Sequence, residues 1–117
     1  MPREKDDNVY LWDMLDSANT IIQFSTGKTF DDYLNDRMLR QAIERNIEII
    51  GEAARRVSEP FKGAHAEVPW RLTVAQRHVL AHEYGEIKHE QIWRVVKMHI
   101  PTLVAQLKTL LPTPPTP

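Results

Sequence analysis

The 117-residue sequence contains no cysteine, which excludes disulfide bonds and metal sites built from thiolates. Glycine is scarce, with four residues, and the sequence holds neither an Asn-Gly nor an Asp-Gly pair. It also lacks any long run in which apolar and polar residues alternate. Without these hairpin and strand signals, the sequence favours a helical fold.

Long apolar runs are missing as well, and none approaches the roughly 18 residues that a membrane-spanning helix needs. Residues 1–8 are polar and charged, so they lack the apolar core of a signal peptide. We therefore expect a cytoplasmic protein with no membrane contact. The formal net charge of −1 gives the chain no overall attraction to nucleic acid, so RNA binding would need a local basic patch.

The length of the chain suits one domain, because two domains of half the size would each bury too small a core. The sequence predicts a helical domain over residues 1–111 and a tail of proline and threonine over residues 112–117. Prolines fill most of the tail and cannot continue a helix, so we expect the tail to be disordered or extended.

Apolar residues recur every three or four positions along four stretches of the chain, which is the spacing of amphipathic helices. The predicted helices span residues 7–25, 29–58, 70–84 and 89–111. Residues 59–69 contain two prolines and a glycine and are predicted to form a loop. Four or five helices joined by short links predict an all-α, up-and-down helical bundle.

Individual residues shape these predicted helices. Thr29 followed by Asp32 resembles a capping box, with aspartate in place of the usual glutamate or glutamine. Gly51 inside the second helix costs roughly 1 kcal/mol relative to alanine, and it suggests a close approach between helices. Pro101 should kink or locally break the last helix.

Some polar residues on the second predicted helix are expected to stabilise its end, and others are expected to face solvent. Arg55 and Arg56 lie near its end, where the negative end of the helix dipole favours cations. Arg45 and Asn46 interrupt an otherwise apolar pattern. They could reach the cleft or a dimer contact, but we expect both to face solvent.

Basic and histidine residues concentrate between positions 71 and 99. If these side chains share a face, they form a modest patch that attracts phosphate groups. The members of this group are Arg71, Arg77, His78, His82, Lys88, His89, Arg94, Lys97 and His99.

RNA can be cleaved without a metal ion when its own 2′-hydroxyl attacks the neighbouring phosphate. A base removes the hydroxyl proton, a cation stabilises the phosphate charge, and an acid protonates the leaving 5′ oxygen. Histidine suits both proton transfers because its pKa lies near neutrality, and arginine can donate two parallel hydrogen bonds to a phosphate. Arg77 and His82 supply these side chains five residues apart and are the candidate catalytic residues.

Helix geometry limits how these two residues can meet. On an ideal α-helix, Arg77 and His82 point roughly 140° apart. They come together only if the helix ends or deforms near Gly85, or if a second chain completes the site. A symmetric dimer would place two copies of each residue in one cleft. Tyr84, seven residues after Arg77, lies on nearly the same helix face as the arginine.

The motif Arg77-x4-His82-x-Tyr84 resembles the R-x4-H-x-Y signature of the HepT toxins, which belong to the HEPN superfamily. HEPN proteins commonly carry a polar residue, often asparagine, directly after the arginine, and His78 stands there. Further segments resemble the family and extend the similarity from about residue 8 to residue 111. These segments are residues 49–54, 68–70, 92–93 and 100–103.

The resemblance implies a HEPN-like homodimer that needs no cofactor and cleaves RNA as the toxin of a type II toxin–antitoxin pair. Arg77 and His82 would be catalytic, and His78 would orient His82 or contact phosphate. The implied partner is a minimal nucleotidyltransferase antitoxin, which neutralises the toxin by binding it, by transferring AMP from ATP to Tyr84, or by both. A phosphodiester beside Arg77 would occupy the substrate phosphate site and block RNA.

Three other interpretations stay open, one of which is a structural helical bundle with no ligand. His78 and His82 have the spacing of a zinc-binding pair on a helix, for which Glu83, Glu86 or His89 would supply a third ligand, although no His-Glu-x-x-His sequence is present. Alternatively, the chain is a non-catalytic HEPN module that binds a nucleotide or presents a surface to a nucleotidyltransferase. The complete Arg–His–Tyr set favours the ribonuclease.

Overall fold

The computed structural model describes residues 6–80 and 88–111, except for the side chains of residues 78 and 79. Every regular element within these ranges is helical, which confirms the all-α fold class. The elements are α1 (Asp7–Ser25), α2 (Phe30–Asn35), α3 (Arg37–Arg56), α4 (Glu59–Ala64), α5 (Trp70–Ala75), the 3-10 turn η1 (Gln76–Val79), α6 (His89–Arg94), the π-helical turn η3 (Val95–His99) and α7 (Ile100–Leu110). No helix among the described residues is long and apolar enough to cross a membrane.

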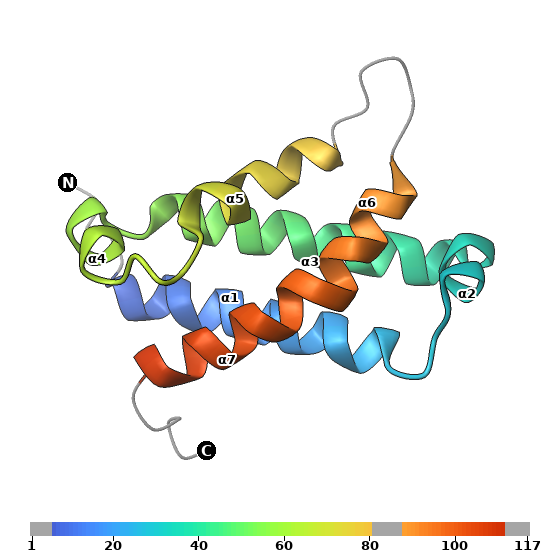
Figure 1. The fold of residues 1–117 in the computed structure, drawn as a ribbon, viewed down its shortest axis with the longest axis horizontal. Helices are drawn as coiled ribbons and strands as arrows, with labels where there is room; N and C mark the ends of the chain where they lie inside the picture. Colours follow the sequence, from blue (N-terminus) through green and yellow to red (C-terminus); the bar gives the residue numbers. More distant parts are fainter. Residues whose placement is uncertain (1–5, 81–87, 112–117) are drawn as a thin grey trace.

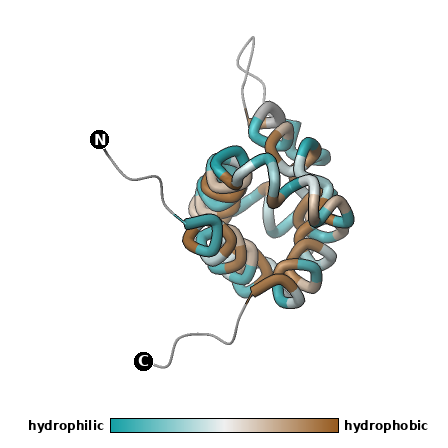
Figure 2. The backbone as a smooth tube through the Cα atoms, turned by 90° about the vertical axis from the view of Figure 1, so that its left-hand side faces the viewer, coloured by the Kyte–Doolittle hydropathy of each residue, from teal (hydrophilic) through white to brown (hydrophobic). Residues whose placement is uncertain are grey.

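Helices α1 and α3 form the centre of the bundle. They run antiparallel, lie side by side and make the largest contact between helices (Figure 1). α7 crosses them and packs on α1, and α5 lies along α3. Hydrophilic and hydrophobic residues are mixed along every helix (Figure 2), as expected when each helix buries one face. The resulting core joins residues from α1, α2, α3, α5, α6, η3 and α7.

α1 has the bounds that the sequence predicts. The Asp6 carboxylate caps it by accepting a hydrogen bond from the backbone N–H of Asn8 at 2.9 Å. The Asp7 carboxylate accepts two more from Ser58, one from the backbone N–H at 2.8 Å and one from the hydroxyl at 2.7 Å. These bonds tie the start of α1 to the junction between α3 and α4, so polar contacts reinforce the apolar packing of the two long helices.

The single helix predicted over residues 29–58 is wrong, because the chain breaks at Asp36. This residue has extended dihedral angles, with φ −119° and ψ 99°, and separates α2 from α3. Its carboxylate accepts a hydrogen bond from the backbone N–H of Leu39 at 3.1 Å and thereby begins α3. The predicted capping box is confirmed, since Thr29 and Asp32 exchange hydrogen bonds of 2.9 and 3.1 Å.

The loop predicted over residues 59–69 is wrong in its first half, where α4 forms. Ser58 caps this helix by accepting a hydrogen bond from the backbone N–H of Phe61 at 3.3 Å. Pro60 lies in the first turn, where a helix has no acceptor for the N–H that proline lacks. The proline therefore marks a helix start here.

The last two predicted helices depart from regular α geometry. The helix expected over residues 70–84 begins at Trp70, but its α-helical part ends at Ala75 and continues as η1. The expected interruption near Pro101 is present as the π turn η3, directly before α7, whose first turn contains the proline. The predictions for residues 81–84 and for the tail over residues 112–117 lie outside the described residues.

His99 joins the end of η3 to α5, and its Nε2 lies 3.3 Å from the Thr73 hydroxyl. Burial lowers the pKa of His99 below its ordinary value of 6.5. Because the folded-state pKa is the lower one, the unfolded chain binds more protons as the pH falls below about 6.5. The stability that the neutral imidazole contributes is therefore lost as the pH decreases.

We expect the free energy of unfolding to fall between about pH 7 and about pH 5, and to fall less steeply in a His99→Gln variant. Urea denaturation of both proteins across this range, followed by circular dichroism, measures the two slopes. Equal slopes would contradict the assignment of this pH dependence to His99, whatever the absolute stability of the variant.

Candidate active site

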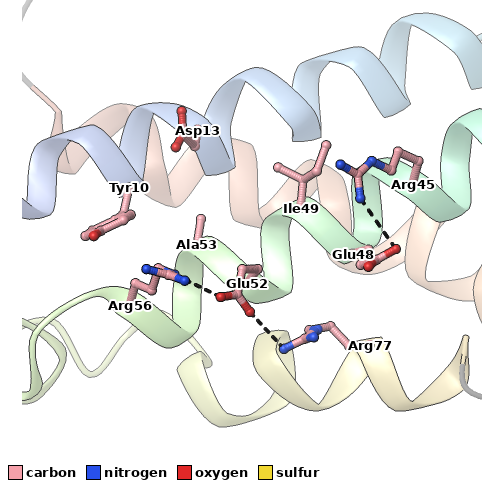
Figure 3. Close-up of a pocket in the computed structure, with 9 residues that line it drawn as sticks. All are labelled: Tyr10, Asp13, Arg45, Glu48, Ile49, Glu52, Ala53, Arg56 and Arg77. Atoms are coloured by element: carbon pink, nitrogen blue, oxygen red, sulfur yellow. Dashed lines mark hydrogen bonds and ion pairs between the residues drawn. The ribbon is translucent and has the colours of Figure 1, made fainter. Parts of the chain in front are cut away.

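Arg77 lies in η1, which α5 holds against α3. The start of α5 is fixed by Trp70, whose buried indole donates a hydrogen bond to the His65 carbonyl at 2.9 Å. The buried Thr73 hydroxyl donates to the Pro69 carbonyl at 2.8 Å. These contacts fix α5, and the Arg77 side chain then points from η1 toward α3 (Figure 3).

Gly51 on α3 makes room for the Arg77 side chain. A Cβ atom at position 51 would lie 2.2 Å from Cγ and 2.4 Å from Cδ of Arg77, closer than carbon atoms can pack. The aliphatic stem of the Arg77 side chain therefore crosses α3 at a glycine, which has no side chain to block it. The predicted close approach at Gly51 is confirmed, and the neighbour is an arginine stem.

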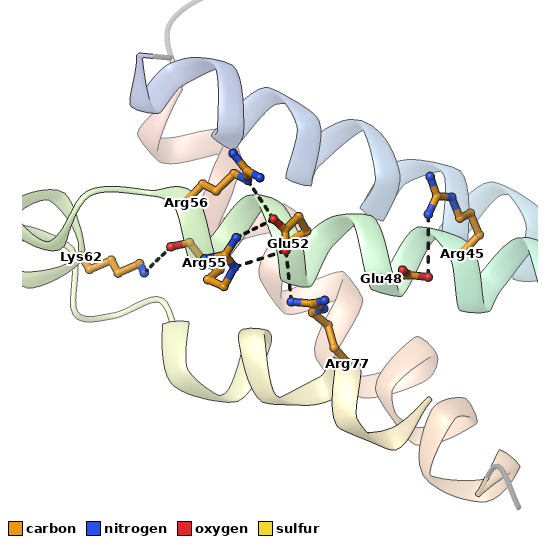
Figure 4. A network of polar contacts seen from close by, with 7 residues as sticks. All are labelled: Arg45, Glu48, Glu52, Arg55, Arg56, Lys62 and Arg77. Atoms are coloured by element: carbon orange, nitrogen blue, oxygen red, sulfur yellow. Dashed lines mark hydrogen bonds and ion pairs between the residues drawn. The ribbon is translucent and has the colours of Figure 1, made fainter. Parts of the chain in front are cut away.

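Glu52, the next residue of α3, binds the guanidinium group. Its Oε2 accepts a hydrogen bond from Arg77 Nη1 at 3.1 Å, and its Oε1 accepts from Arg55 Nη2 and Arg56 Nε, each at 2.8 Å (Figure 4). The hydrogen bonds from Arg55 and Arg56 lower the pKa of Glu52 to about 2. One carboxylate thus faces three guanidinium groups, which leaves this part of α3 with a surplus of positive charge.

The Glu52–Arg77 pair borders a polar cavity of about 520 Å³ between α1, α3 and η1 (Figure 3). The Arg77 side chain is 35% exposed, so the guanidinium can be reached from solvent. Its Nε is buried and has no hydrogen-bond partner among residues 6–80 and 88–111. Its lining includes three arginines, Arg45, Arg56 and Arg77, and three carboxylates, Asp13, Glu48 and Glu52. An anionic group in the cavity would bind through the arginine forks. The residues that line the cavity are Tyr10, Asp13, Arg45, Glu48, Ile49, Glu52, Ala53, Arg56 and Arg77.

Only part of the predicted site falls within the described residues. The structure describes the Arg77 side chain and the backbone of His78, whereas His82 and Tyr84 lie outside the described ranges. Whether His82 and Tyr84 meet Arg77 therefore stays a prediction. The assumed α-helix through residue 77 is wrong, because η1 is a 3-10 turn with about three residues per turn. Because His82 lies outside the described residues, its direction relative to Arg77 stays a prediction.

Glu52 is the residue at this site that the sequence interpretation missed. Arg55 and Arg56 follow it by three and four positions, which is the spacing of helical ion pairs and was the available signal. The sequence prediction placed Arg55 and Arg56 at the negative end of the helix dipole and did not include their ion pairs with Glu52. Arg45 is exposed as expected, and it lines the cavity and forms an ion pair of 3.8 Å with Glu48. The expected exposure of Asn46 is wrong, because its side chain is half-buried and its Nδ2 donates a hydrogen bond to the Ala42 carbonyl at 2.8 Å.

His89, considered above as a zinc ligand, is engaged at the start of α6. Its Nδ1 lies 3.1 Å from the hydroxyl of Tyr33, a fully buried side chain of α2. Burial raises the pKa of Tyr33 above its ordinary value, so the phenol stays protonated. Within the part of the chain that the structure describes, no three His, Asp or Glu side chains are grouped to hold a metal ion. The His78 side chain and His82 lie outside the described residues.

The helical bundle, together with the motif that begins at Arg77, defines a HEPN-type protein. The chain belongs to the HepT-like ribonuclease family, described as "Ribonuclease HepT-like", which matches residues 14–110. No solved structure matches the chain.

Three relatives resemble the chain over most of its length. A Methanocaldococcus jannaschii protein named "Putative RNase MJ1380" is 33% identical over 105 residues, or 90% of this chain and 96% of the relative. A Caldanaerobacter subterraneus protein named "Putative RNase TTE0752" is 34% identical over 102 residues, covering 87% and 91%. A Thermococcus cleftensis protein named "Probable ribonuclease HepT" is 35% identical over 101 residues, covering 86% and 92%.

The contact between Gly51 and Arg77 predicts the effect of a single methyl group. In Gly51→Ala the Arg77 side chain must move, and we expect overpacking to lower the free energy of unfolding by about 1–3 kcal/mol, offset in part by the better helix propensity of alanine. The matched control is Gly63→Ala, because a Cβ there meets no atom within 4 Å. Chemical denaturation gives the stabilities, and the Arg77 Nε–H resonance in ¹H–¹⁵N NMR reports the displacement. An unmoved resonance in Gly51→Ala would contradict this account.

Proposed function

We propose that this chain is a metal-independent ribonuclease that cleaves RNA by attack of the 2′-hydroxyl on the adjacent phosphate. The bond between the 2′ oxygen and phosphorus forms while the bond to the 5′ oxygen breaks, which leaves a 2′,3′-cyclic phosphate and a 5′-hydroxyl. Arg77 stabilises the charge that develops on the phosphate. His82 takes the proton from the 2′-hydroxyl or gives one to the 5′ oxygen, and His78 orients His82 or contacts phosphate.

The observation that carries this proposal is the fixed position of Arg77 beside a polar cavity. Its stem crosses α3 over Gly51, and its guanidinium lies 3.1 Å from Glu52, so the cation is oriented before substrate arrives. Such positioning favours catalysis because the cation is already beside the cavity when charge develops on the phosphate. Membership in a ribonuclease family supports the choice of RNA as the substrate.

A phosphate would compete with Glu52 for Arg77. Because Arg55 and Arg56 also hold the Glu52 carboxylate, that carboxylate keeps two cationic partners when Arg77 turns to substrate. The exchange therefore leaves neither a lone carboxylate nor a lone guanidinium, which would be costly in a partly buried site. The arrangement supports a phosphate-binding role for Arg77 more than a purely structural one.

Removal of either proposed catalytic side chain tests the reaction. We expect Arg77→Ala to lower kcat/KM for a short RNA on the order of a hundredfold or more, and His82→Ala by roughly 10²–10⁴-fold. Arg37→Ala is the matched control, because Arg37 is exposed at the start of α3, away from the cavity. Mass spectrometry of the products should find the 2′,3′-cyclic phosphate, with EDTA present throughout.

If EDTA abolishes cleavage, metal independence is refuted and the zinc interpretation gains support. If the wild type leaves RNA intact, the ribonuclease proposal fails and the non-catalytic HEPN module becomes the better explanation.

We also propose that the active form is a homodimer whose sites combine Arg77 of one protomer with His82 of its partner. Mixing the two inactive variants of the preceding experiment, with time for subunit exchange, would then rebuild one intact site in each mixed dimer. Random mixing should restore about a quarter of the wild-type activity. If no activity returns although mixed dimers form, both residues act within one chain.

The proposed cellular role is that of a cytoplasmic toxin held in check by a minimal nucleotidyltransferase antitoxin. The antitoxin binds the toxin, or the Tyr84 oxygen attacks the α-phosphorus of ATP and releases pyrophosphate, or both occur. The attached AMP adds negative charge and bulk where Arg77 would receive the substrate phosphate. The R-x4-H-x-Y motif supports this role.

Transfer of AMP predicts a mass change at one tyrosine. After incubation with ATP and a minimal nucleotidyltransferase antitoxin, intact-mass spectrometry should find added AMP units and RNA cleavage should fall. Tyr84→Phe should gain no mass, whereas Tyr10→Phe, which alters the tyrosine that lines the cavity, should be modified like the wild type. Equal modification of Tyr84→Phe would refute the assignment of the acceptor.

A further inference from the structure

A second cavity, of about 650 Å³, lies where the end of α3 meets α4 and α5. Three cationic side chains line it, Arg55 from α3, Lys62 from α4 and Arg71 from α5. Among the described residues, Glu59 is the one acidic residue that lines it. Val74 and the buried Trp70 complete the wall, so the cavity has an apolar side and a cationic side.

Lys62 is held in this cavity, not spread into solvent. Its side chain is only 15% exposed, and its Nζ lies 3.4 Å from the backbone carbonyl of Arg55, to which it donates a hydrogen bond. The nearest carboxylate, that of Glu59, is 3.6 Å away on a side chain that is 89% exposed. An exposed partner of this kind holds a cation weakly and can be replaced by an entering anion.

A continuous line of polar contacts connects this cavity to the candidate active site. Lys62 contacts Arg55, Arg55 binds Glu52, and Glu52 binds Arg77 (Figure 4). Arg56 joins the same carboxylate from the other side. Together the linings of the two cavities hold six cationic side chains and four carboxylates, in a chain whose formal net charge is −1.

We propose that the second cavity binds backbone phosphates of RNA that flank the cleaved bond. The proposal rests on the ribonuclease function proposed above, because it places the scissile phosphate at Arg77. A row of cations beside an apolar wall suits a single-stranded backbone, whose charge repeats and whose sugars and bases offer apolar faces. Contacts of this kind fix the position of the strand without reading its sequence. The cavity therefore favours longer substrates, whatever their bases.

The test compares a Lys62→Ala/Arg71→Ala double variant with the wild type on a dinucleotide and on a 12-nucleotide RNA. We expect kcat/KM for the long RNA to fall about tenfold, since two phosphate contacts are lost, and kcat/KM for the dinucleotide to stay unchanged. The matched control is Lys28→Ala/Lys108→Ala, which removes the same charge from exposed positions outside both cavities. Thermal unfolding of all three proteins shows whether each is folded.

Binding of an uncleavable 2′-O-methyl RNA of the same length gives a readout that does not depend on catalysis. The slope of log Kd against log salt should be smaller in the double variant by roughly 1.4, or about 0.7 for each lost contact on a single strand. If the wild type cleaves both substrates and the double variant matches the control in rate and in slope, the cavity assignment is refuted and the ribonuclease proposal stands.

Other outcomes separate the two proposals. If the wild type cleaves neither substrate, the ribonuclease proposal fails, and an unchanged salt slope would then refute the phosphate assignment as well. If the double variant binds RNA normally but no longer binds the nucleotidyltransferase, the cavity belongs to a protein interface and the RNA assignment is refuted.

Discussion

The packing of the Arg77 stem on the α3 backbone at Gly51 is the constraint on which the arrangement of the site depends. It sets how closely η1 approaches α3, because any side chain at position 51 would collide with Cγ and Cδ of the arginine. It also brings the guanidinium to Glu52, the next residue of the same helix. The cavity between α1, α3 and η1 follows from this approach. A steric condition at one glycine thereby fixes the geometry of a charged site.

Much of the fold could be predicted from the sequence, because the long helices bury one regular face. The stripe of α1 gives its bounds directly, and Thr29 with Asp32 marks the start of α2. The departures come from residues with two possible roles. Asp36 sits in an unbroken apolar pattern yet caps a new helix, and Pro60 suggests a loop yet suits the first turn of α4. Periodicity alone cannot separate these roles, since they depend on local hydrogen bonds that form only in the folded chain.

The candidate site was predictable in its residue types more than in its geometry. Arg77 could be identified from its motif, and it does face a polar cavity. The role of Glu52 at the site was not predicted, because a glutamate near arginines on a helix usually lies on a solvated surface. Its importance depends on a partner 25 positions later in the chain, and no local pattern reports such a contact. The change from α-helix to 3-10 turn at residue 76 was also hidden, because both geometries tolerate the same residues over so short a stretch.

The shared carboxylate at Glu52 has a consequence for how the protein responds to acidity. With a pKa of about 2, this group stays ionised throughout the range in which histidines gain and lose protons. The three arginines around it are permanently charged, so the cluster forms a constant electrostatic background at the cavity. Any change in catalytic rate near neutral pH must therefore originate in side chains other than these four. These four side chains keep their charges near neutral pH and do not exchange protons there. The dependence of activity on pH would therefore report only the groups that transfer protons.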